Sequence, residues 1–305
     1  MSGRRRSRVR AALVTAATVL VAIGVTAGAG EAASAPNPCS LSGVTPPATY
    51  DHVVVIFEEN ASYGRVIGNA DAPYFNQLAG QCALATNYHE VAGVSQPNYM
   101  AATGGQATGV SVKVNAPSIF SQAPSWLELQ ESMGSNCGGK STFYKRGHDP
   151  AYWYTPLAQQ CKVNDIPAAT SQSGLATIPS PLPAYTFITP NLCHNNHWLK
   201  GCPQPNTGSA NLRAMDTWLQ GTVQTITSTA SYQGGGTLIL ISFDESNTSS
   251  SIIPMVAVAG GIMPVKDGTS YDQYALLRAS EEALGIQTFL GKAAGAADMR
   301  AGMHF

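Results

Sequence analysis

Residues 52–60 of the chain read HVVVIFEEN, an apolar run that stops abruptly at two carboxylates and an amide. A continuous run of Val and Ile has no polar face, so it predicts a central strand that helices cover on both sides, as in doubly wound α/β sheets. Ligands of such sheets bind beyond the carboxyl ends of the strands, and we therefore expect Glu59 and Asn60 to lie at a site. The alternative is a solvated turn, because acidic residues often follow strands as turn or N-cap groups.

A second apolar run, residues 237–243 (TLILISF), also ends in acid, at Asp244 and Glu245. We expect it to be another buried strand that delivers its acidic pair to the same edge of the sheet. Carboxylate and amide oxygens form a hard ligand set, which suits Ca²⁺, Mg²⁺ or Mn²⁺ better than a metal that prefers thiolates. Alone, this acidic pair would fit a helix cap equally well, but the matching pair after the first strand favours a metal site.

Ser95 stands two residues before Pro97, in the segment 93–102 (GVSQPNYMAA). Proline is favoured in the first turn of a helix, so Ser95 is predicted at or near a helix N-cap. Backbone N–H groups and the positive end of the helix dipole would there stabilise a serine alkoxide and hold a phosphate oxygen. The alternative for Ser95 is a structural N-cap that takes no part in chemistry.

Between the two acid-ended runs, Ser209 is predicted to cap a helix that covers one face of the sheet. The apolar positions that recur at helical spacing are Leu212, Met215, Leu219, Val223 and Ile226. Asp216 lies off that stripe, and we leave it out of the main group of site residues and keep it as a secondary candidate. Residues 83–89 (ALATNYH) are predicted to form an exposed strand or extended segment.

Residues 1–35 are predicted to be a secretory signal peptide, because five arginines precede a mildly apolar segment that ends in small residues at Ala35. Cleavage after Ala35 would leave Pro36 first, so a cut nearer Ala29 or Ala32 fits equally well. The alternative is an uncleaved membrane anchor, since the apolar run is nearly long enough to span a bilayer. Its many Ala, Gly and Thr residues favour cleavage, and we expect a secreted protein with no stable membrane insertion.

The charge of residues 36–305 argues against a nucleic-acid partner. Loss of residues 1–35 removes five of 17 basic residues and one of 18 acidic residues, which leaves 12 basic, 17 acidic and a formal charge of −5. A protein that binds the phosphate backbone needs a basic stripe, and residues 36–305 contain none. Their length suffices for a single α/β domain with an ample core, and nothing in them indicates an oligomeric state.

The even number of cysteines in a chain with a leader predicts three disulfides. The cysteines are Cys39, Cys82, Cys137, Cys161, Cys193 and Cys202. Neighbours in sequence suggest the pairs Cys137–Cys161 and Cys193–Cys202, which leaves Cys39–Cys82, although other pairings are formally possible. A zinc site is the alternative, but no two cysteines stand as close in sequence as paired zinc ligands usually do.

Several short segments, taken in chain order, carry a resemblance to a known family. They are 59–60 (EN), 86–88 (TNY), 95–99 (SQPNY), 144–150 (YKRGHDP), 189–193 (TPNLC), 216–219 (DTWL) and 237–245 (TLILISFDE). In this order they resemble the bacterial phosphoesterase family that contains secreted acid phosphatases and phospholipases C. The resemblance covers essentially all of residues 36–305. It implies an alkaline-phosphatase-like α/β fold, a three-layer α/β/α sandwich with a largely parallel central sheet.

The resemblance also implies roles for particular residues. It implies a divalent metal ion, Ca²⁺, Mg²⁺, Mn²⁺ or Zn²⁺, bound by oxygen donors, and the matching donors are Glu59, Asn60, Ser95, Asp244 and Glu245. Ser95 matches the nucleophile of the family as well as a metal ligand. His148 and His197 match histidines that lie near the phosphate, and we therefore expect them in the catalytic group.

Three places depart from the pattern of the family. Val94 and Gln273 stand where the family usually has histidine, and residues 194–197 (HNNH) replace the usual Asn-Asp-Met-His. These departures bear on proton transfer and on a second metal.

Together, the residues and the resemblance predict a secreted, metal-dependent phosphoric ester hydrolase, an acid phosphatase that acts on phosphomonoesters. One alternative is a phosphodiesterase of the phospholipase C type, and in either case we expect a small-molecule or lipid phosphate ester as the substrate. A second alternative is a catalytically silent secreted binding protein on the same fold, which the departures allow. Retention of Ser95 together with both acidic strand ends argues against the silent protein.

Overall fold

The computed structural model describes residues 1, 3 and 36–305, and residues 37–305 form one compact unit. Apart from residues 1 and 3, the predicted signal peptide lies outside the described residues. Within the described part of the chain, no helix is long and apolar enough to span a membrane.

A mostly parallel sheet of nine strands runs through residues 37–305 in the order β10-β2-β9-β8-β1-β7-β3-β4, with β11 beside β2. The strands are β1 His52–Glu58, β2 Ala83–His89, β3 Trp126–Glu131, β4 Asp165–Ala168, β7 Tyr185–Thr189, β8 Thr237–Phe243, β9 Ile252–Val258, β10 Val265–Asp267 and β11 Tyr271–Asp272. β9 alone runs antiparallel, against both β2 and β8. The hairpin of β5 Thr170–Ser171 and β6 Gly174–Leu175 lies apart from this sheet.

The strand predicted from residues 52–60 is the centre of the sheet. β1 pairs in parallel with β7 on one side and with β8 on the other, and residues 53–58 are buried. A strand with neighbours on both sides and helices on both faces favours apolar side chains, which explains the run of residues 53–57; the polar Glu58 follows at the end of the strand and is also buried.

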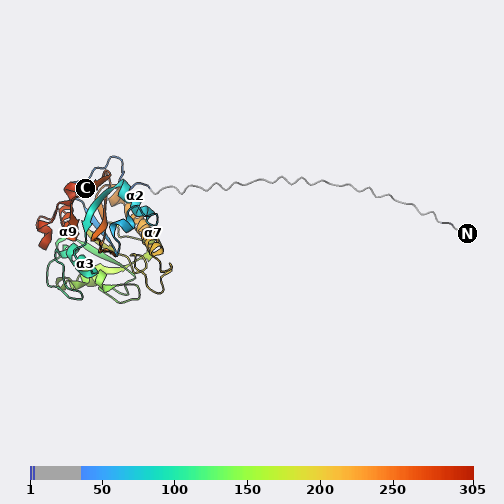
Figure 1. Ribbon diagram of the computed structural model, residues 1–305, viewed down its shortest axis with the longest axis horizontal. Helices are drawn as coiled ribbons and strands as arrows, with labels where there is room; N and C mark the ends of the chain where they lie inside the picture. The colour runs from blue at the N-terminus through green and yellow to red at the C-terminus, as the bar shows by residue number, and fades with distance from the viewer. Residues whose placement is uncertain (2, 4–35) are drawn as a thin grey trace. The chain divides into compact units, whose positions relative to one another are not determined.

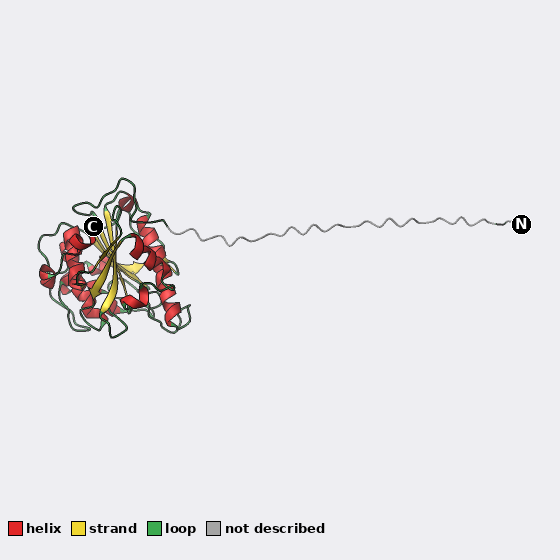
Figure 2. Ribbon diagram, turned by 45° about the horizontal axis from the view of Figure 1, so that its top comes forward, coloured by secondary structure: helices red, strands yellow, loops and turns green. Residues whose placement is uncertain are grey.

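Helices cover both faces of the sheet, as Figure 2 shows. In Figure 1, α2 (Pro73–Gln81) and α7 (Gly208–Thr227) lie on one side of the strands, and α3 (Ser95–Gly104) and α9 (Gln273–Ala283) lie on the other. Each of these two pairs is in mutual contact. The predicted three-layer α/β/α sandwich is therefore confirmed.

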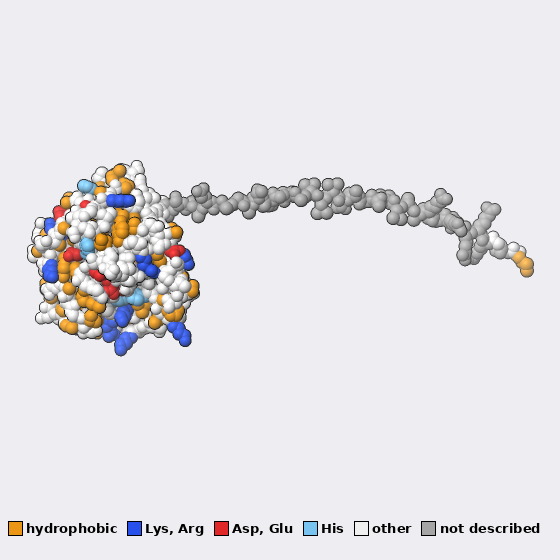
Figure 3. All heavy atoms as spheres, viewed as in Figure 1, with side chains coloured by type: hydrophobic (Ala, Val, Ile, Leu, Met, Phe, Trp, Pro, Cys, Tyr) orange, Lys and Arg blue, Asp and Glu red, His pale blue; other side chains and the backbone are white. Residues whose placement is uncertain are grey.

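Shorter helical segments connect these main elements. They are α1 Tyr63–Val66, α4 Ile119–Gln122, α5 Pro150–Trp153, α6 Cys161–Asn164, α8 Ala230–Gln233, α10 Met299–Met303 and the 3₁₀ turns η1 Arg146–His148, η2 Thr155–Leu157 and η3 Gly291–Gly295. On the face drawn in Figure 3, Lys and Arg side chains lie in small separate groups among polar and apolar surface.

α7 buries the apolar stripe that its spacing predicts, but its cap is not Ser209. The N-cap is Thr207, whose backbone is extended and whose Oγ1 accepts a hydrogen bond from the N–H of Ala210 at 3.2 Å. Ser209 lies inside the first turn of α7, after the N-cap. Asp216 faces α2 and accepts hydrogen bonds from the N–H groups of Tyr74 (2.9 Å) and Phe75 (2.8 Å), so it satisfies donors that the start of α2 leaves free.

β2 is less exposed than its sequence suggests. Ala83, Leu84, Ala85 and Tyr88 are buried, because β2 pairs with β9 on one side and with β10 and β11 on the other. The prediction of an exposed strand is therefore wrong for most of β2, although Thr86, Asn87 and His89 are only partly buried.

All six cysteines are paired, and the three disulfides join the predicted partners. They are Cys39–Cys82, Cys137–Cys161 and Cys193–Cys202. The first joins the segment before β1 to the start of β2, and the other two close short loops between β3 and α7. The zinc alternative is wrong, because no thiolate remains to bind a metal.

Candidate active site

The two acidic strand ends meet because β1 and β8 are parallel neighbours. Glu58 is paired with Phe243, so the residues that follow each strand leave the sheet side by side. The N–H of Asp244 donates to the carbonyl oxygen of Glu58 at 2.9 Å, and the N–H of Asn60 donates to Asp244 Oδ1 at 3.1 Å. Asn60 has a φ of 47°, a left-handed conformation that Asn tolerates better than most residues. The turn at Asn60 brings residues 59–60 close to residues 244–245.

Ser95 is the first residue of α3, but it does not cap that helix. The N-cap position belongs to Val94, which has an extended backbone and makes no side-chain cap. The Ser95 hydroxyl instead lies 3.2 Å from Glu59 Oε2 and 3.4 Å from Glu245 Oε1. The alternative of a purely structural N-cap therefore does not describe this serine. Its oxygen faces both acidic strand ends at the positive end of a helix.

The loop before α3 is fixed by Asn98, which the sequence analysis did not single out. Asn98 Oδ1 accepts from the N–H groups of Val91 and Ala92 at 3.0 Å each, and its Nδ2 donates to the carbonyl oxygens of Ala92 (2.6 Å) and Val94 (3.1 Å). Asn98 is fully buried. These bonds hold residues 91–94 against the first turn of α3 and so set the position of Ser95.

Glu59 is fully buried and uses its two oxygens differently. Oε1 accepts a hydrogen bond from the hydroxyl of Tyr99 and lies 3.1 Å from His148 Nδ1. Oε2 faces Ser95 and lies 3.4 Å from Asn60 Nδ2. Burial, followed by the charge of Asp244, raises the pKa of Glu59 well above its usual range.

The two histidines predicted for the catalytic group lie together, with ring centroids 5.8 Å apart. His197 Nε2 lies 2.7 Å from Asn60 Nδ2, and its side chain is one-third exposed. His148 is buried and stacks on Tyr99. Burial and then Lys145 lower the pKa of His197 to about 4. Burial, then His197 and Lys145, hold the pKa of His148 well below its usual range. Both rings are therefore neutral near pH 7.

A second buried network, of hydrogen bonds, supports the loop that carries His197. The sequence analysis did not predict it. Glu131, the last residue of β3, accepts from the N–H of Asn191 at 2.9 Å and lies 2.9 Å from His194 Nδ1. Asn191 Oδ1 accepts from the N–H of Cys193 at 2.8 Å, and Asn196 Nδ2 donates to the carbonyl oxygen of Asn60 at 2.8 Å. The loop is thus tied to β3 through Asn191 and His194, and to the residues that follow β1 through Asn196.

The donor set of the site fits a hard divalent cation. Asp244 Oδ2 and Glu245 Oε2 are buried and, among the described residues, have no hydrogen-bond partner. Burial raises the pKa of Asp244 to about 6, and burial together with Asp244 raises that of Glu245 to about 7. Carboxylates that crowd a serine oxygen and keep free lone pairs are the ligands that Mg²⁺, Mn²⁺ and Ca²⁺ require. The structure brings together all seven residues predicted for the site.

Two of the departures from the family pattern have structural consequences. Val94 is about half exposed (49%) and offers no ligand atom. Gln273 is buried at the start of α9, and its Nε2 donates to the carbonyl oxygen of Asp244 at 2.8 Å. Gln273 therefore supports the backbone of a predicted metal ligand from the side of α9.

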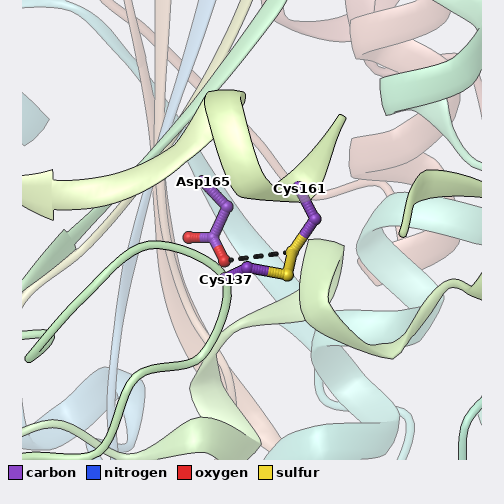
Figure 4. Close-up of side chains that lie close together, drawn as sticks. All are labelled: Cys137, Cys161 and Asp165. Atoms are coloured by element: carbon purple, nitrogen blue, oxygen red, sulfur yellow. Dashed lines mark hydrogen bonds between the residues drawn. A yellow bond between two sulfur atoms is a disulfide. The ribbon is translucent and has the colours of Figure 1, made fainter. Parts of the chain in front are cut away.

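Two other side-chain groups of the described residues bring three possible ligand atoms within 4.8 Å of one another. One is Cys137, Cys161 and Asp165, drawn in Figure 4, where the two sulfurs form a disulfide and cannot act as thiolate ligands. The other consists of the buried carboxyls of Glu128, Asp149 and Asp165. Neither group contains a residue of the predicted site.

Comparison with known proteins relates the chain to phosphatases. The family described as the phosphoesterase family matches residues 69–263. A probable acid phosphatase of Kluyveromyces lactis is 26% identical, over 88% of this chain and 66% of that protein. A phosphatidylinositol-3-phosphatase of Mycobacterium tuberculosis is also 26% identical, over 78% of each chain. This chain thus spans slightly less than two-thirds of the length of the yeast relative.

A solved structure supports the fold. A protein of the alkaline phosphatase superfamily from Vibrio parahaemolyticus superimposes with a TM-score of 0.57, over 81% of this chain and 69% of that chain. Only 10% of the aligned residues are identical, so the similarity concerns the fold alone.

Proposed function

Because the chain belongs to the phosphoesterase family, we propose that it is a secreted phosphoric ester hydrolase with Ser95 as its nucleophile and a divalent metal ion as its cofactor. One observation carries the proposal. The Ser95 hydroxyl lies at the first turn of α3 and within 3.4 Å of carboxylates from both strand ends. An alcohol so placed has proton acceptors beside it and a helix N-terminus behind it, which are the requirements of an activated serine.

The residues that would hold the metal are Glu59, Asn60, Ser95, Asp244 and Glu245. A divalent cation bound there supplies positive charge that lowers the pKa of the serine hydroxyl and neutralises a phosphate oxygen.

Ser95 then performs the chemistry in two steps. Its Oγ attacks phosphorus while Glu59 or Glu245 accepts the hydroxyl proton, the Oγ–P bond forms, and the bond from phosphorus to the leaving oxygen breaks with its electron pair. The leaving alcohol takes a proton from water. A second water then attacks phosphorus and gives a proton to the hydroxide left by the first. The P–Oγ bond breaks with its electron pair on Oγ, Oγ regains the proton held by the carboxyl group, and phosphate is released. N–H groups at the start of α3 donate hydrogen bonds to the phosphoryl oxygens during both steps, and we place the ring of His197 beside them.

His197 is better placed than His148 to meet a substrate. Its side chain is one-third exposed, whereas that of His148 is 4% exposed. Lys145 lies close enough to lower the pKa of both rings and adds positive charge near the phosphate.

The names of the relatives favour a monoester substrate. An acid phosphatase and a phosphatidylinositol-3-phosphatase both remove a terminal phosphate, the second from a lipid headgroup. We extend this to the present chain and propose a small or lipid phosphomonoester as its substrate. The three disulfides suit an oxidising compartment, which supports secretion.

The test is hydrolysis of p-nitrophenyl phosphate and of p-nitrophenyl phosphorylcholine by the purified protein, with and without a chelator. We expect cleavage of the monoester, loss of activity with the chelator and recovery when Mg²⁺ or Mn²⁺ is restored. Faster cleavage of the choline diester would instead identify the phospholipase C alternative. If neither ester is hydrolysed when metal is present, the result would favour the alternative of a catalytically silent binding protein.

A further inference from the structure

The two oxygens of Glu59 have unequal surroundings. Oε1 is held by the hydroxyl of Tyr99 and by Nδ1 of His148, at 3.1 Å. Oε2 faces the nucleophile instead, 3.2 Å from Ser95 Oγ. When a bound cation keeps Glu59 ionised, its oxygens only accept hydrogen bonds, so His148 would carry its proton on Nδ1 and two donors, Tyr99 and His148, would occupy Oε1. The contacts of Oε2 are instead Ser95 and, at 3.4 Å, Asn60 Nδ2, both from predicted metal ligands, so Oε2 is the oxygen that faces the cation site.

Tyr99 is held rigidly in this position. Its ring stacks on His148 with centroids 5.4 Å apart and an interplanar angle of 4°, and it meets Phe57 edge to face at 4.7 Å. The side chain is fully buried. It lies one helical turn after Ser95 on α3, so the nucleophile and the phenol share one rigid element. Packing therefore fixes the direction in which the hydroxyl donates.

We propose that Tyr99 is a positioning residue that, with His148, occupies Oε1 of Glu59 and makes Glu59 a one-oxygen ligand of the metal. The inference rests on the proposed function, because it assumes a divalent cation at the site. Mg²⁺ and Mn²⁺ accept six ligands in octahedral geometry, whereas Ca²⁺ takes more oxygens and often both oxygens of a carboxylate. A clamped Glu59 thus selects the smaller cations over Ca²⁺.

The experiment is to measure the dissociation constants of Mn²⁺ and of Ca²⁺ on metal-free protein by titration calorimetry, which needs no turnover. The variant Tyr99→Phe keeps the ring stack and removes only the hydroxyl. Loss of a hydrogen-bond partner of a metal ligand typically weakens binding about 10- to 100-fold, and we expect this for Mn²⁺. Because Oε1 then keeps His148 Nδ1 as its single contact and can bind a cation more readily, the Ca²⁺ affinity should fall less, and the preference for Mn²⁺ over Ca²⁺ should shrink.

Tyr154→Phe is the matched control. Tyr154 is also buried and packs beside α3. The variant removes the hydrogen bonds of its hydroxyl with Thr103 Oγ1 at 2.9 Å and with the carbonyl oxygen of Met100 at 3.4 Å, and this hydroxyl does not contact Glu59. We expect the control to keep the parental affinities for both cations. A merely structural role for Tyr99 would lower its melting temperature as in Tyr154→Phe and leave the Mn²⁺ to Ca²⁺ preference unchanged, which would overturn the inference.

The outcomes separate this inference from the proposed function. If the parent protein binds neither cation, the metal-dependent function fails and the inference fails with it. If the parent binds Mn²⁺ and Tyr99→Phe binds both cations as the parent does, only the inference fails. A structure of the Mn²⁺-loaded parent is a second check that does not depend on any variant folding. It should show Glu59 on the metal through Oε2 alone, and Oε1 bound to the metal would contradict the proposal.

Discussion

Glu59 follows β1 and Asp244 follows β8, and their carboxylates repel each other when both are ionised. Both side chains are fully buried, and their mutual charge adds to burial in raising the pKa of Glu59. Two carboxylates in a buried site cannot both ionise at low cost without a compensating charge. The proposed divalent cation supplies that charge and would bind the oxygen that Asp244 leaves without a partner.

We therefore predict that Glu59→Gln and Asp244→Asn each lower metal affinity by about tenfold or more, because an amide carries no charge for a hard cation. Both changes keep the shape of the side chain, so the fold should persist. Elemental analysis after dialysis against a defined Mn²⁺ buffer gives the readout. Asp216→Asn is the control, since Asp216 is buried but binds the N–H groups of α2. Equal metal content in the three variants and the parent would refute the site.

The sequence predicts this site unevenly at the residue scale. Glu59, Asp244 and Glu245 are predictable because an apolar run that ends in acid has a physical meaning of its own. His148 and His197 depend on family resemblance, since no local pattern marks them. The contacts of Tyr99, Asn98 and Gln273 were not predicted, because they depend on where a side chain points after distant elements have packed.

Three elements meet at a buried group of carboxyls outside the site. Glu128 belongs to β3, Asp149 caps α5 and Asp165 begins β4, and one oxygen from each lies within 4.8 Å of the others. Burial, and then the charge of Asp149, raises the pKa of Asp165 to about 9. In unfolded chains Asp165 would titrate near pH 4. The folded protein therefore keeps a proton here that the unfolded chain has lost.

This proton has a predictable effect on stability. A raised pKa means that its stabilising contribution is complete below the unfolded pKa and is lost as pH rises through the folded value. Between pH 7 and pH 9 we expect the free energy of unfolding to fall by on the order of 1 kcal/mol per pH unit. Asp165→Asn, which stays neutral, should flatten this slope. Urea unfolding at pH 7, 8 and 9 measures it.

The control for this prediction is Asp71→Asn. Asp71 pairs with Arg213 at the surface, and its pKa lies below its usual value, so it is ionised in both states above pH 7. Its variant should keep the parental slope between pH 7 and pH 9. A parental slope in Asp165→Asn as well would show that the extra proton is not held by Asp165.

Element by element, the strands and helices with one strong pattern were predicted well. β1 and β8 follow from unbroken apolar runs, and α7 follows from a stripe at helical spacing. The errors occur where two signals compete. Thr207 and Ser209 are both good caps, and only the backbone conformation decides between them. β2 contains polar residues, but its neighbours β9 and β10 come late in the chain and cover it.

At the scale of the molecule, disulfides and sheet order together determine the site. Two of the three disulfides lie in the region between β3 and α7, which also carries His148 and His197. Neither histidine lies in a strand or an α-helix, so the disulfides and the network of Glu131 help to hold the segments that carry them. The parallel order of β7, β1 and β8 then places its loops at the same edge as Glu59 and Asp244.

The central claim is that Ser95 is a nucleophile, and the turnover of Ser95→Ala on p-nitrophenyl phosphate tests it most directly. Since Ser95 does not cap α3, its loss should change the free energy of unfolding by less than about 0.5 kcal/mol. Removal of the covalent route should nevertheless lower kcat by about a thousandfold or more. We predict a variant that melts with the parent and is nearly inactive. A variant that melts with the parent and retains a tenth or more of its turnover would contradict the account.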